Sequence, residues 1–239
     1  MSNQIDPIPA LGLLIAFIPA IIVFAIMWRW AAGVQTAIYA TLRMLLQLLL
    51  IGYVLVYIFD TEQPLVIATV LTVMLLAASW IAIRPLHHKT GNAYLRTLFA
   101  IGVGGVLTLA LVTQFVLSVQ PWFSPRHVVP LAGMIFAGCM NTVSLAAERI
   151  QAELLKETTF EKARNSAFTA AMIPIVNSLF AVGLVTLPGM MTGQILSGIS
   201  PLIAAKYQIV VMAMIFGASG IAAALYLHGP GSKRAGLEP

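Results

Sequence analysis

Long apolar stretches separated by short polar segments recur along this chain of 239 residues. Each stretch is close to the roughly 20 residues that a helix needs to cross the hydrocarbon core of a bilayer. Barrel strands are about half as long and alternate apolar with polar residues, which these stretches do not. We therefore expect an all-α polytopic membrane bundle that forms a single transmembrane domain over residues 1–239. The predicted spans are Ile8–Trp28, Thr36–Phe59, Pro64–Ile83, Thr97–Val119, Val128–Ala147, Ala167–Leu187 and Tyr207–His228.

Composition excludes a soluble fold. Apolar residues make up 60% of the chain and charged residues 9%, whereas soluble domains carry roughly 25% charged residues. A net charge of +5 would suggest a nucleic-acid partner in a soluble protein, but here the question is which side of the bilayer the cations occupy. We expect the lipid bilayer, and no nucleic acid, as a partner. A single cysteine, Cys139, excludes an internal disulfide.

The cations are distributed very unevenly between alternate loops. Ten fall on one side and two on the other, so the positive-inside rule predicts an outside N-terminus and a cytoplasmic C-terminus in the inner (plasma) membrane. Seven spans are an odd number, so the two termini must lie on opposite sides of the membrane. The ten cations of the predicted inner side are Arg29, Arg84, Lys89, Arg96, Arg149, Lys156, Lys162, Arg164, Lys233 and Arg234, and the two of the outer side are Arg126 and Lys206.

The longest inner segment, residues 148–166, is the main aqueous surface of the predicted fold. Ile150 and Leu154 recur at helical spacing, so we expect the fifth span to continue as an amphipathic helix. Thr158 and Glu161 form a capping-box pattern, which predicts a second helix from about Thr159. Two helices that meet at an elbow can bind another protein. A solvated connector is the alternative.

A second irregular segment runs from Pro188 to Pro201 and contains Gly189 and Gly193. It is too short to cross, yet apolar enough to lie at the membrane. We expect a non-helical, re-entrant or gating segment on the outer side, because irregular backbone at membrane depth needs protein or a water-filled cavity around it. An interfacial loop is the alternative, and the spacing of the two glycines would also suit a helix contact.

Polar side chains are few inside the predicted spans. No Asp or Glu lies there, which disfavours a proton-relay carrier. Arg43 and Gln47 share a helix face and either line a polar path or leave Arg43 snorkelling to the interface. Asn141 begins a polar stripe that is typical of hydrogen bonding between helices. The sequence lacks a P-loop and a nucleophile triad, so we expect neither ATP hydrolysis by this chain nor an enzyme.

Four further runs are informative: Arg43-Met-Leu-Leu-Gln, Pro130-Leu-Ala-Gly-Met, Ile173-Pro-Ile-Val-Asn-Ser and Leu187-Pro-Gly-Met-Met-Thr-Gly. These runs resemble the UPF0014 family, which includes the FetB-type ABC transporter permeases. The resemblance implies a permease subunit that forms a homodimer and works with a separate ABC-type ATP-binding subunit. ATP would bind that subunit, and this chain would hold no cofactor. Ala137-Gly138 departs from the Gly-Asn usual in the family and removes a polar side chain from the fifth span.

The expected function is therefore export of a metal ion such as iron, with metal-site residues unknown. The alternatives are a non-transporting scaffold or regulatory subunit, and an ABC permease for a non-metal substrate. The candidate path or gate residues are Arg43, Gln47, Asn141, Asn177, Pro188, Gly189, Met190, Met191 and Gly193. The candidate ATPase-coupling residues are Glu148, Leu154, Thr158, Phe160 and Glu161.

Overall fold

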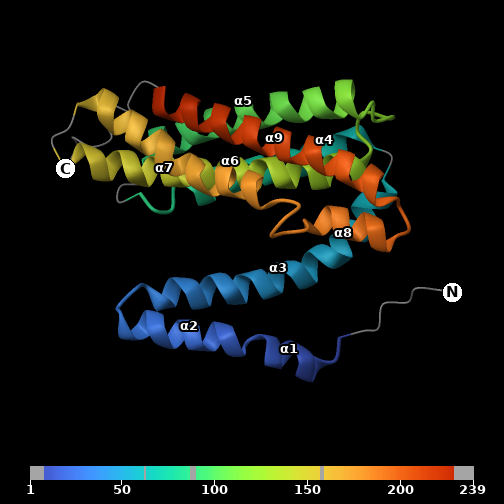
Figure 1. The fold of residues 1–239 in the computed structure, drawn as a ribbon, viewed down its shortest axis with the longest axis horizontal. Helices are drawn as coiled ribbons and strands as arrows, with labels where there is room; N and C mark the ends of the chain where they lie inside the picture. The colour runs from blue at the N-terminus through green and yellow to red at the C-terminus, as the bar shows by residue number, and fades with distance from the viewer. Residues whose placement is uncertain (1–7, 62, 87–89, 157–158, 229–239) are drawn as a thin grey trace. The chain divides into compact units, whose positions relative to one another are not determined.

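The computed structural model describes residues 8–61, 63–86, 90–156 and 159–228, and its regular elements there are helices (Figure 1). This confirms the predicted all-α fold class. The α-helices are α1 Ala10–Ala16, α2 Ile18–Arg29, α3 Val34–Asp60, α4 Pro64–Ala82, α5 Gly91–Leu111, α6 Pro125–Leu154, α7 Phe160–Ala181, α8 Gly189–Leu196 and α9 Pro201–His228. A short π-helix, Val112–Val116, directly follows α5.

The chain divides into two compact units at Asp60. The first unit contains α1, α2 and α3. Pro19 lies in the first turn of α2, and α1 ends just before that turn because proline cannot donate a backbone hydrogen bond and its ring clashes with the preceding turn. α2 and α3 form a hairpin whose connection contains Gly33 at φ +67°, a left-handed conformation that suits glycine. The prediction of one domain over residues 1–239 stays a prediction.

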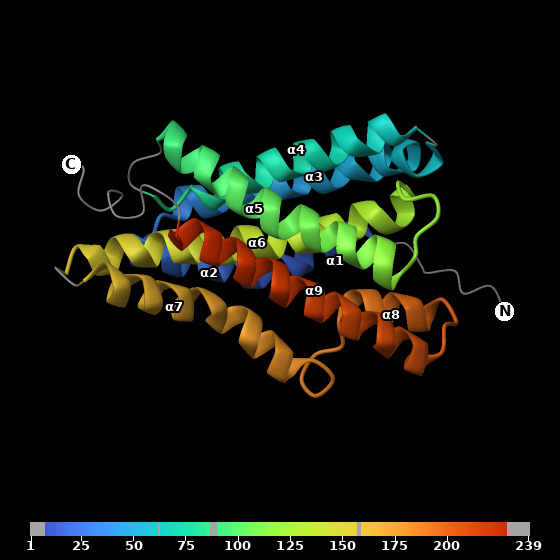
Figure 2. The ribbon, with the colours of Figure 1, turned by 90° about the horizontal axis from the view of Figure 1, so that it is seen from above.

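The second unit is built around α6, which packs against α4, α5, α7 and α9 (Figure 2). α6 carries many buried side chains, among them Ile135, Cys139 and Val143, each with no exposed surface. Because lipid is as apolar as these side chains, association of helices in a bilayer depends on close packing rather than on the hydrophobic effect. α6 is therefore the axis on which the other helices are positioned.

Glycines allow this close packing. A Cβ on Gly104 of α5 would lie 3.0 Å from the carbonyl oxygen of Ala218 and 3.0 Å from the amide nitrogen of Ala222, both in α9. A Cβ on Gly138 of α6 would lie 2.8 Å from Cγ2 of Ile215. Small residues thus bring the backbones of α5, α6 and α9 together, as is common between membrane helices. At Gly138 the neighbouring helix fills the space that a larger side chain would need.

Among the helices of the described residues, six are long and apolar enough to span a membrane. They correspond to six of the predicted spans and comprise Ala10–Arg29, Val34–Asp60, Pro64–Ala82, Gly91–Val116, Pro125–Leu154 and Pro201–His228. The predicted sixth span, Ala167–Leu187, has no counterpart among them. It corresponds to α7, which begins earlier and ends at Ala181.

The bounds of the predicted sixth span differ from those of α7 because apolar residues continue past the end of the helix. Gly183 adopts φ +84°, and its amide donates to the carbonyl oxygen of Thr186, so the chain turns. Leu184 and Val185 in this turn are 90% and 81% exposed. Hydropathy counts these residues as part of a span, but it does not detect a left-handed backbone. Figure 2 shows that α7 and α8 together extend along the length of α9.

The predicted non-helical segment after Pro188 is also different in the structure. Gly189 and Gly193 lie within α8, and Pro188 is its N-cap. The helix ends in a Schellman motif, in which Gly198 at φ +90° donates to the carbonyl oxygen of Ile195 and Ile199 donates to that of Gln194. The irregular backbone therefore flanks α8, at Gly183 and Gly198, instead of occupying it.

Candidate coupling site and substrate path

The elbow between α6 and α7 lies at one end of the second unit. α6 ends at Leu154 and α7 begins at Phe160 after Thr159, which confirms the predicted second helix. The side chain of Thr159 makes no capping hydrogen bond. Thr158, the predicted capping residue, lies outside the described residues. We define the elbow as residues 148–166.

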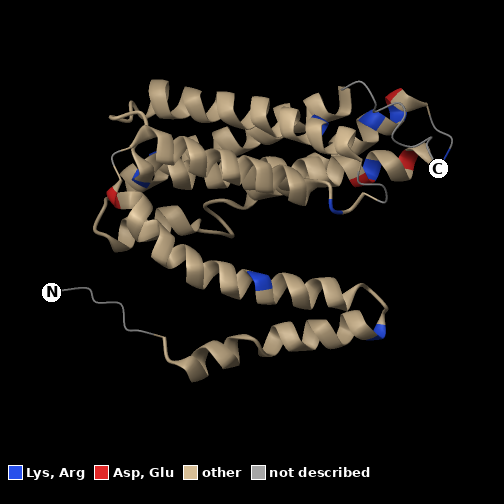
Figure 3. Ribbon diagram, turned by 180° about the vertical axis from the view of Figure 1, so that it is seen from behind, with Lys and Arg blue, Asp and Glu red and all other residues tan. Residues whose placement is uncertain are grey.

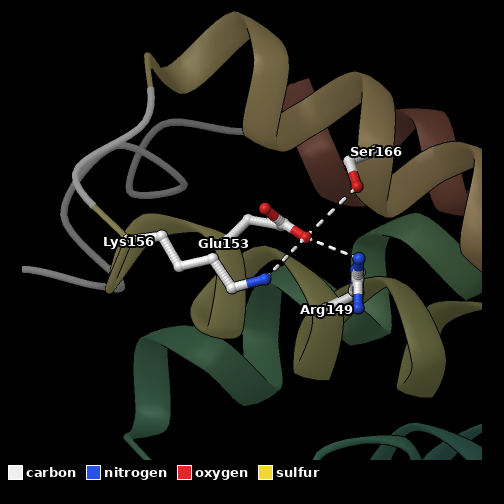
Figure 4. A network of polar contacts seen from close by, with 4 residues as sticks. All are labelled: Arg149, Glu153, Lys156 and Ser166. Carbon is white, nitrogen blue, oxygen red and sulfur yellow. Dashed lines mark hydrogen bonds and ion pairs between the residues drawn. The ribbon is translucent and has the colours of Figure 1, made fainter.

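A buried carboxylate joins the two helices of the elbow (Figure 4). Glu153 Oε1 lies 2.6 Å from Arg149 Nη2 and 3.5 Å from Lys156 Nζ, both on its own side of the elbow. Ser166 Oγ, on α7, donates to the same oxygen at 3.4 Å. The side chain of Glu153 is only 11% exposed. Its charge is therefore stabilised by two cations and a hydroxyl, and the contact with Ser166 crosses from α6 to α7.

Sequence reasoning missed Glu153. The signal was present, because Arg149 precedes it by four residues and Lys156 follows it by three, which are the spacings of ion pairs on a helix. The interaction with Ser166 depends on how the two helices meet. A pattern along one helix does not predict that contact.

The carboxyl end of α9 is joined to the same end of the bundle. Arg96 of α5 donates to the carbonyl oxygen of Tyr226 through Nε at 2.7 Å and also through Nη2. Its guanidinium carbon lies 4.3 Å from the centroid of the Tyr226 ring. Nη1 of Arg164, on α7, lies 3.4 Å from Nε2 of His228. Cations from α5 and α7 thus hold the end of α9, where unpaired carbonyl groups favour positive charge.

The predicted coupling residues lie together at the elbow. Glu148 and Glu161 are exposed, whereas Leu154 and Phe160 are half-buried. Leu155, which follows α6, is 76% exposed and is the most accessible large apolar side chain described there. Figure 3 shows the charged residues of the second unit concentrated at this end, with few at the other end of the unit.

The predicted path residues occupy separate parts of the chain. Arg43 and Gln47 lie on α3 in the first unit, half-buried and exposed respectively. Asn141 on α6 and Asn177 on α7 are both exposed in the second unit. The coupling residues therefore lie together in the second unit, whereas the path residues lie on helices of both units. Their roles stay predictions.

The predicted gate residues belong to α8 or directly precede it, and α8 packs against α9. Met190 and Met191 are half-buried, and Gly189 and Gly193 have open space where a Cβ would lie. In α9, Gln208 is 6% exposed and its Oε1 atom has no hydrogen-bond partner among the described residues. Sequence reasoning missed this buried amide. Among the described residues, no group of three or more His, Cys, Asp or Glu side chains is placed to hold a metal ion.

Comparison with known proteins identifies the family. The model of the "Uncharacterised protein family (UPF0014)" matches residues 10–160 and 155–231. The chain is 33% identical to UPF0014 membrane protein slr1647 of Synechocystis, covering 78% of this chain and 74% of the relative. It is 34% identical to the probable iron export permease protein FetB of Escherichia coli, covering 75% and 73%. No solved structure matches it.

A plant relative falls in the same group. Protein ALUMINUM SENSITIVE 3 of Arabidopsis thaliana is 31% identical, and the alignment covers 77% of this chain and 71% of the relative. These matches confirm the family resemblance that the sequence motifs indicated. With its apolar helices, the protein is a multi-pass membrane protein, and it belongs to the UPF0014 family.

Proposed function

We propose that this chain is the membrane permease subunit of an ABC transporter that exports a metal ion such as iron, and that a separate ATPase subunit supplies the energy. The relative named as a probable iron export permease supports the transport role and the metal. The metal is cargo in this proposal. ATP binds the partner subunit, because this sequence contains no P-loop.

The elbow is the observation that carries the proposal. A motor subunit in the cytoplasm needs a rigid surface on the permease through which to transmit its movement. The elbow supplies one, since Glu153 ties the end of α6 to α7 through Ser166. Arg164 then connects α7 to His228 at the end of α9, and α9 packs against α8 at its other end. Movement of the elbow would thus reach the predicted gate through α9.

Charge supports the orientation. Arg84 follows α4 and Arg96 lies near the start of α5, at the end of the second unit that holds the elbow. Arg126 and Lys206 lie near the starts of α6 and α9, at the other end. Figure 3 shows most cations of this unit gathered at the end of the elbow. By the positive-inside rule the elbow is cytoplasmic, and the N-terminus lies outside. In this proposal the protein lies in the inner (plasma) membrane, where the elbow faces a cytoplasmic ATPase.

Two substitutions at the elbow test the coupling. An amphipathic surface is anchored in a groove by a few apolar residues, so Leu155→Asp and Phe160→Asp should each lower the amount of ATPase that co-purifies with the permease by roughly tenfold or more. Phe160→Asp is compatible with the start of α7, because a carboxylate is favourable at a helix N-terminus. Arg84→Asp is the control, since it introduces the same carboxylate at another exposed position of the same end.

Co-purification and ATP hydrolysis should be measured on the same detergent extracts. The proposal expects the unsubstituted permease to change the hydrolysis rate of the bound ATPase, and the Arg84 variant to behave like it. If both elbow variants retain full ATPase binding and normal hydrolysis, the elbow is not the coupling site. If the permease itself never co-purifies with an ATPase, the transporter proposal is wrong.

A further inference from the structure

Buried oxygen atoms without hydrogen-bond partners gather on two neighbouring helices. Within the part of the chain that the structure describes, four buried side-chain nitrogen or oxygen atoms have no partner, and three of them are oxygens. These oxygens are Oε1 of Gln194, Oε1 of Gln208 and Oγ of Ser219. Gln194 belongs to α8 and the other two to α9, and these two helices pack against each other. The fourth atom, Nε of Arg149, lies in the elbow.

Gln208 lies inside a helix that is long and apolar enough to span the membrane. α9 begins at Pro201, so Gln208 is roughly 10 Å along the helix at about 1.5 Å per residue. It is 6% exposed and shares the buried face of α9 with Ala204 and Val211. An acceptor without a partner is costly where hydrocarbon supplies no donor. A ligand that reaches Oε1 would remove this cost.

Ser219 continues the same face of α9 toward the elbow. It follows Gln208 by eleven residues, which is close to three helical turns, and it has no exposed surface. A Cβ on Gly138 of α6 would lie 2.9 Å from Oγ of Ser219, so α6 covers this oxygen closely. The buried face of α9 therefore carries unpaired oxygens at two depths along its length.

Gln194 lies near the same end of α9 as Gln208. Each residue is within roughly two helical turns of the connection between α8 and α9, residues 197–200. We call Gln194 and Gln208 the amide pair. Both unpaired atoms are amide oxygens, which accept hydrogen bonds and cannot donate them. The amide pair therefore offers negative partial charge from two packed helices.

A cation fits two such oxygens. Amide oxygens bind divalent cations that prefer oxygen ligands, and retained water molecules can complete the coordination. Lys206 does not oppose this, because it is exposed and lies roughly 200° around α9 from Gln208. Neutral ligands also bind a cation weakly enough for it to leave, as transport requires.

We propose that the amide oxygens of Gln194 and Gln208 form a binding site for a divalent cation that keeps part of its water shell. The proposal rests on the proposed function for the identity of this cation as the exported cargo. Binding itself needs neither ATP nor the ATPase subunit. The site can therefore be tested on the permease alone.

Binding of Mn²⁺ to the purified permease in detergent, measured by electron paramagnetic resonance, is the direct test. Mn²⁺ prefers oxygen ligands and its signal distinguishes free from bound ion. Gln208→Met and Gln194→Met keep the approximate size of the side chain but remove the oxygen, so each should weaken Mn²⁺ binding by roughly tenfold or more. Gln208→Glu replaces the amide with a carboxylate and should strengthen binding by a similar factor.

A matched substitution and a stability measurement separate binding from folding. Gln114→Met is the control, because Gln114 is exposed and its Nε2 atom donates to Oγ1 of Thr113 at 3.3 Å. This variant should bind Mn²⁺ as the unsubstituted permease does. Without metal, Gln208→Met should unfold at the same temperature as the unsubstituted permease or at a higher one, because it removes a buried acceptor that has no partner.

The proposal is overturned if the unsubstituted permease binds no Mn²⁺, or if the two amide-pair Met variants bind it as tightly as Gln114→Met. It is also overturned if Gln208→Glu binds Mn²⁺ no more tightly than the unsubstituted permease. Iron transport in vesicles separates this proposal from the proposed function. ATP-driven Fe²⁺ transport that persists undiminished in Gln208→Met would contradict the amide site alone. Mn²⁺ binding that depends on the amide pair, in a chain that transports no metal, would contradict the proposed function alone.

Discussion

At the scale of single residues, Glu153 shows how a buried charge can organise a membrane protein at its aqueous end. One carboxylate oxygen receives Arg149, Lys156 and Ser166; Arg149 comes from the same helix as Glu153, and Lys156 lies just beyond its end. Ion pairs on one helix contribute little, but a carboxylate that is mostly buried is costly to leave without partners. The contact with Ser166 of α7 therefore helps to hold the two helices of the elbow together.

The first prediction concerns this contact. Glu153→Gln keeps the size of the side chain but removes the charge that holds Arg149 and Lys156. We expect it to lower the free energy of unfolding by about 1–2 kcal/mol, the order of a hydrogen-bonded charge that is partly exposed to solvent. Thermal unfolding in detergent measures this. Glu148→Gln is the control, because Glu148 is exposed one turn earlier on the same helix.

The role given to Glu153 requires the Glu153→Gln variant to unfold at a lower temperature than the Glu148→Gln variant. Equal unfolding temperatures for the Glu153 and Glu148 variants would mean that the carboxylate does not stabilise the elbow. A cytoplasmic ATPase bound to the elbow would then need some other rigid feature to act on.

At the scale of elements, six of the seven predicted spans correspond to helices that can cross a membrane. They were predictable because a run of apolar residues of the required length has few alternatives in a bilayer. The helix α7 was predicted with the wrong bounds, because the apolar turn at Gly183 extends the hydropathy average beyond the end of the helix.

The candidate site was predictable to a smaller extent. The elbow followed from the helical spacing of apolar residues and from the start signal near Thr159. Glu153–Ser166 and Arg96–Tyr226 did not follow, because each joins residues whose proximity depends on the packing of two helices. The non-helical backbone predicted at Gly189 and Gly193 was wrong, because glycine is also tolerated inside a short helix.

The second prediction compares two glycines of the helix core. Gly104→Ala should lower the free energy of unfolding by roughly 1–3 kcal/mol, because the new Cβ meets backbone atoms of α9 that cannot move aside. Gly217→Ala should leave stability unchanged or raise it by up to about 1 kcal/mol, because no atom lies within 4 Å and alanine favours helix. Opposite signs in thermal unfolding are expected. A harmless Gly104 variant would show that α5 and α9 are not in close contact.

The third prediction concerns the ends of α8. Gly198→Ala should destabilise the protein by roughly 1–2 kcal/mol, because a side chain is strained at φ +90°. Gly193→Ala, in the same segment, should be tolerated, since its Cβ would enter open space within a helix. Unfolding temperature and dimer content in detergent report both effects. If the substitution at Gly193 is the more harmful one, the hinge lies inside α8, as the sequence first suggested.

At the scale of the whole molecule, the account depends on connections that begin at the elbow and end at α8. The cations of the second unit gather at the end that holds the elbow, which the proposed function places in the cytoplasm (Figure 3). α9 runs from that end, where Arg96 and Arg164 hold it, to the other end, where it packs against α8. A movement imposed at one surface of the membrane therefore has a continuous route to the other.

ATP-dependent metal uptake into inside-out membrane vesicles tests the central claim most directly. Export from the cell becomes uptake in such vesicles, so vesicles that contain this chain and its ATPase should accumulate Fe²⁺ when ATP is added outside. The Phe160→Asp variant should accumulate little, because its elbow no longer receives the movement of the ATPase. If accumulation is the same with and without this chain, or is unaffected by ATP, the protein is not the permease of an ATP-driven metal exporter.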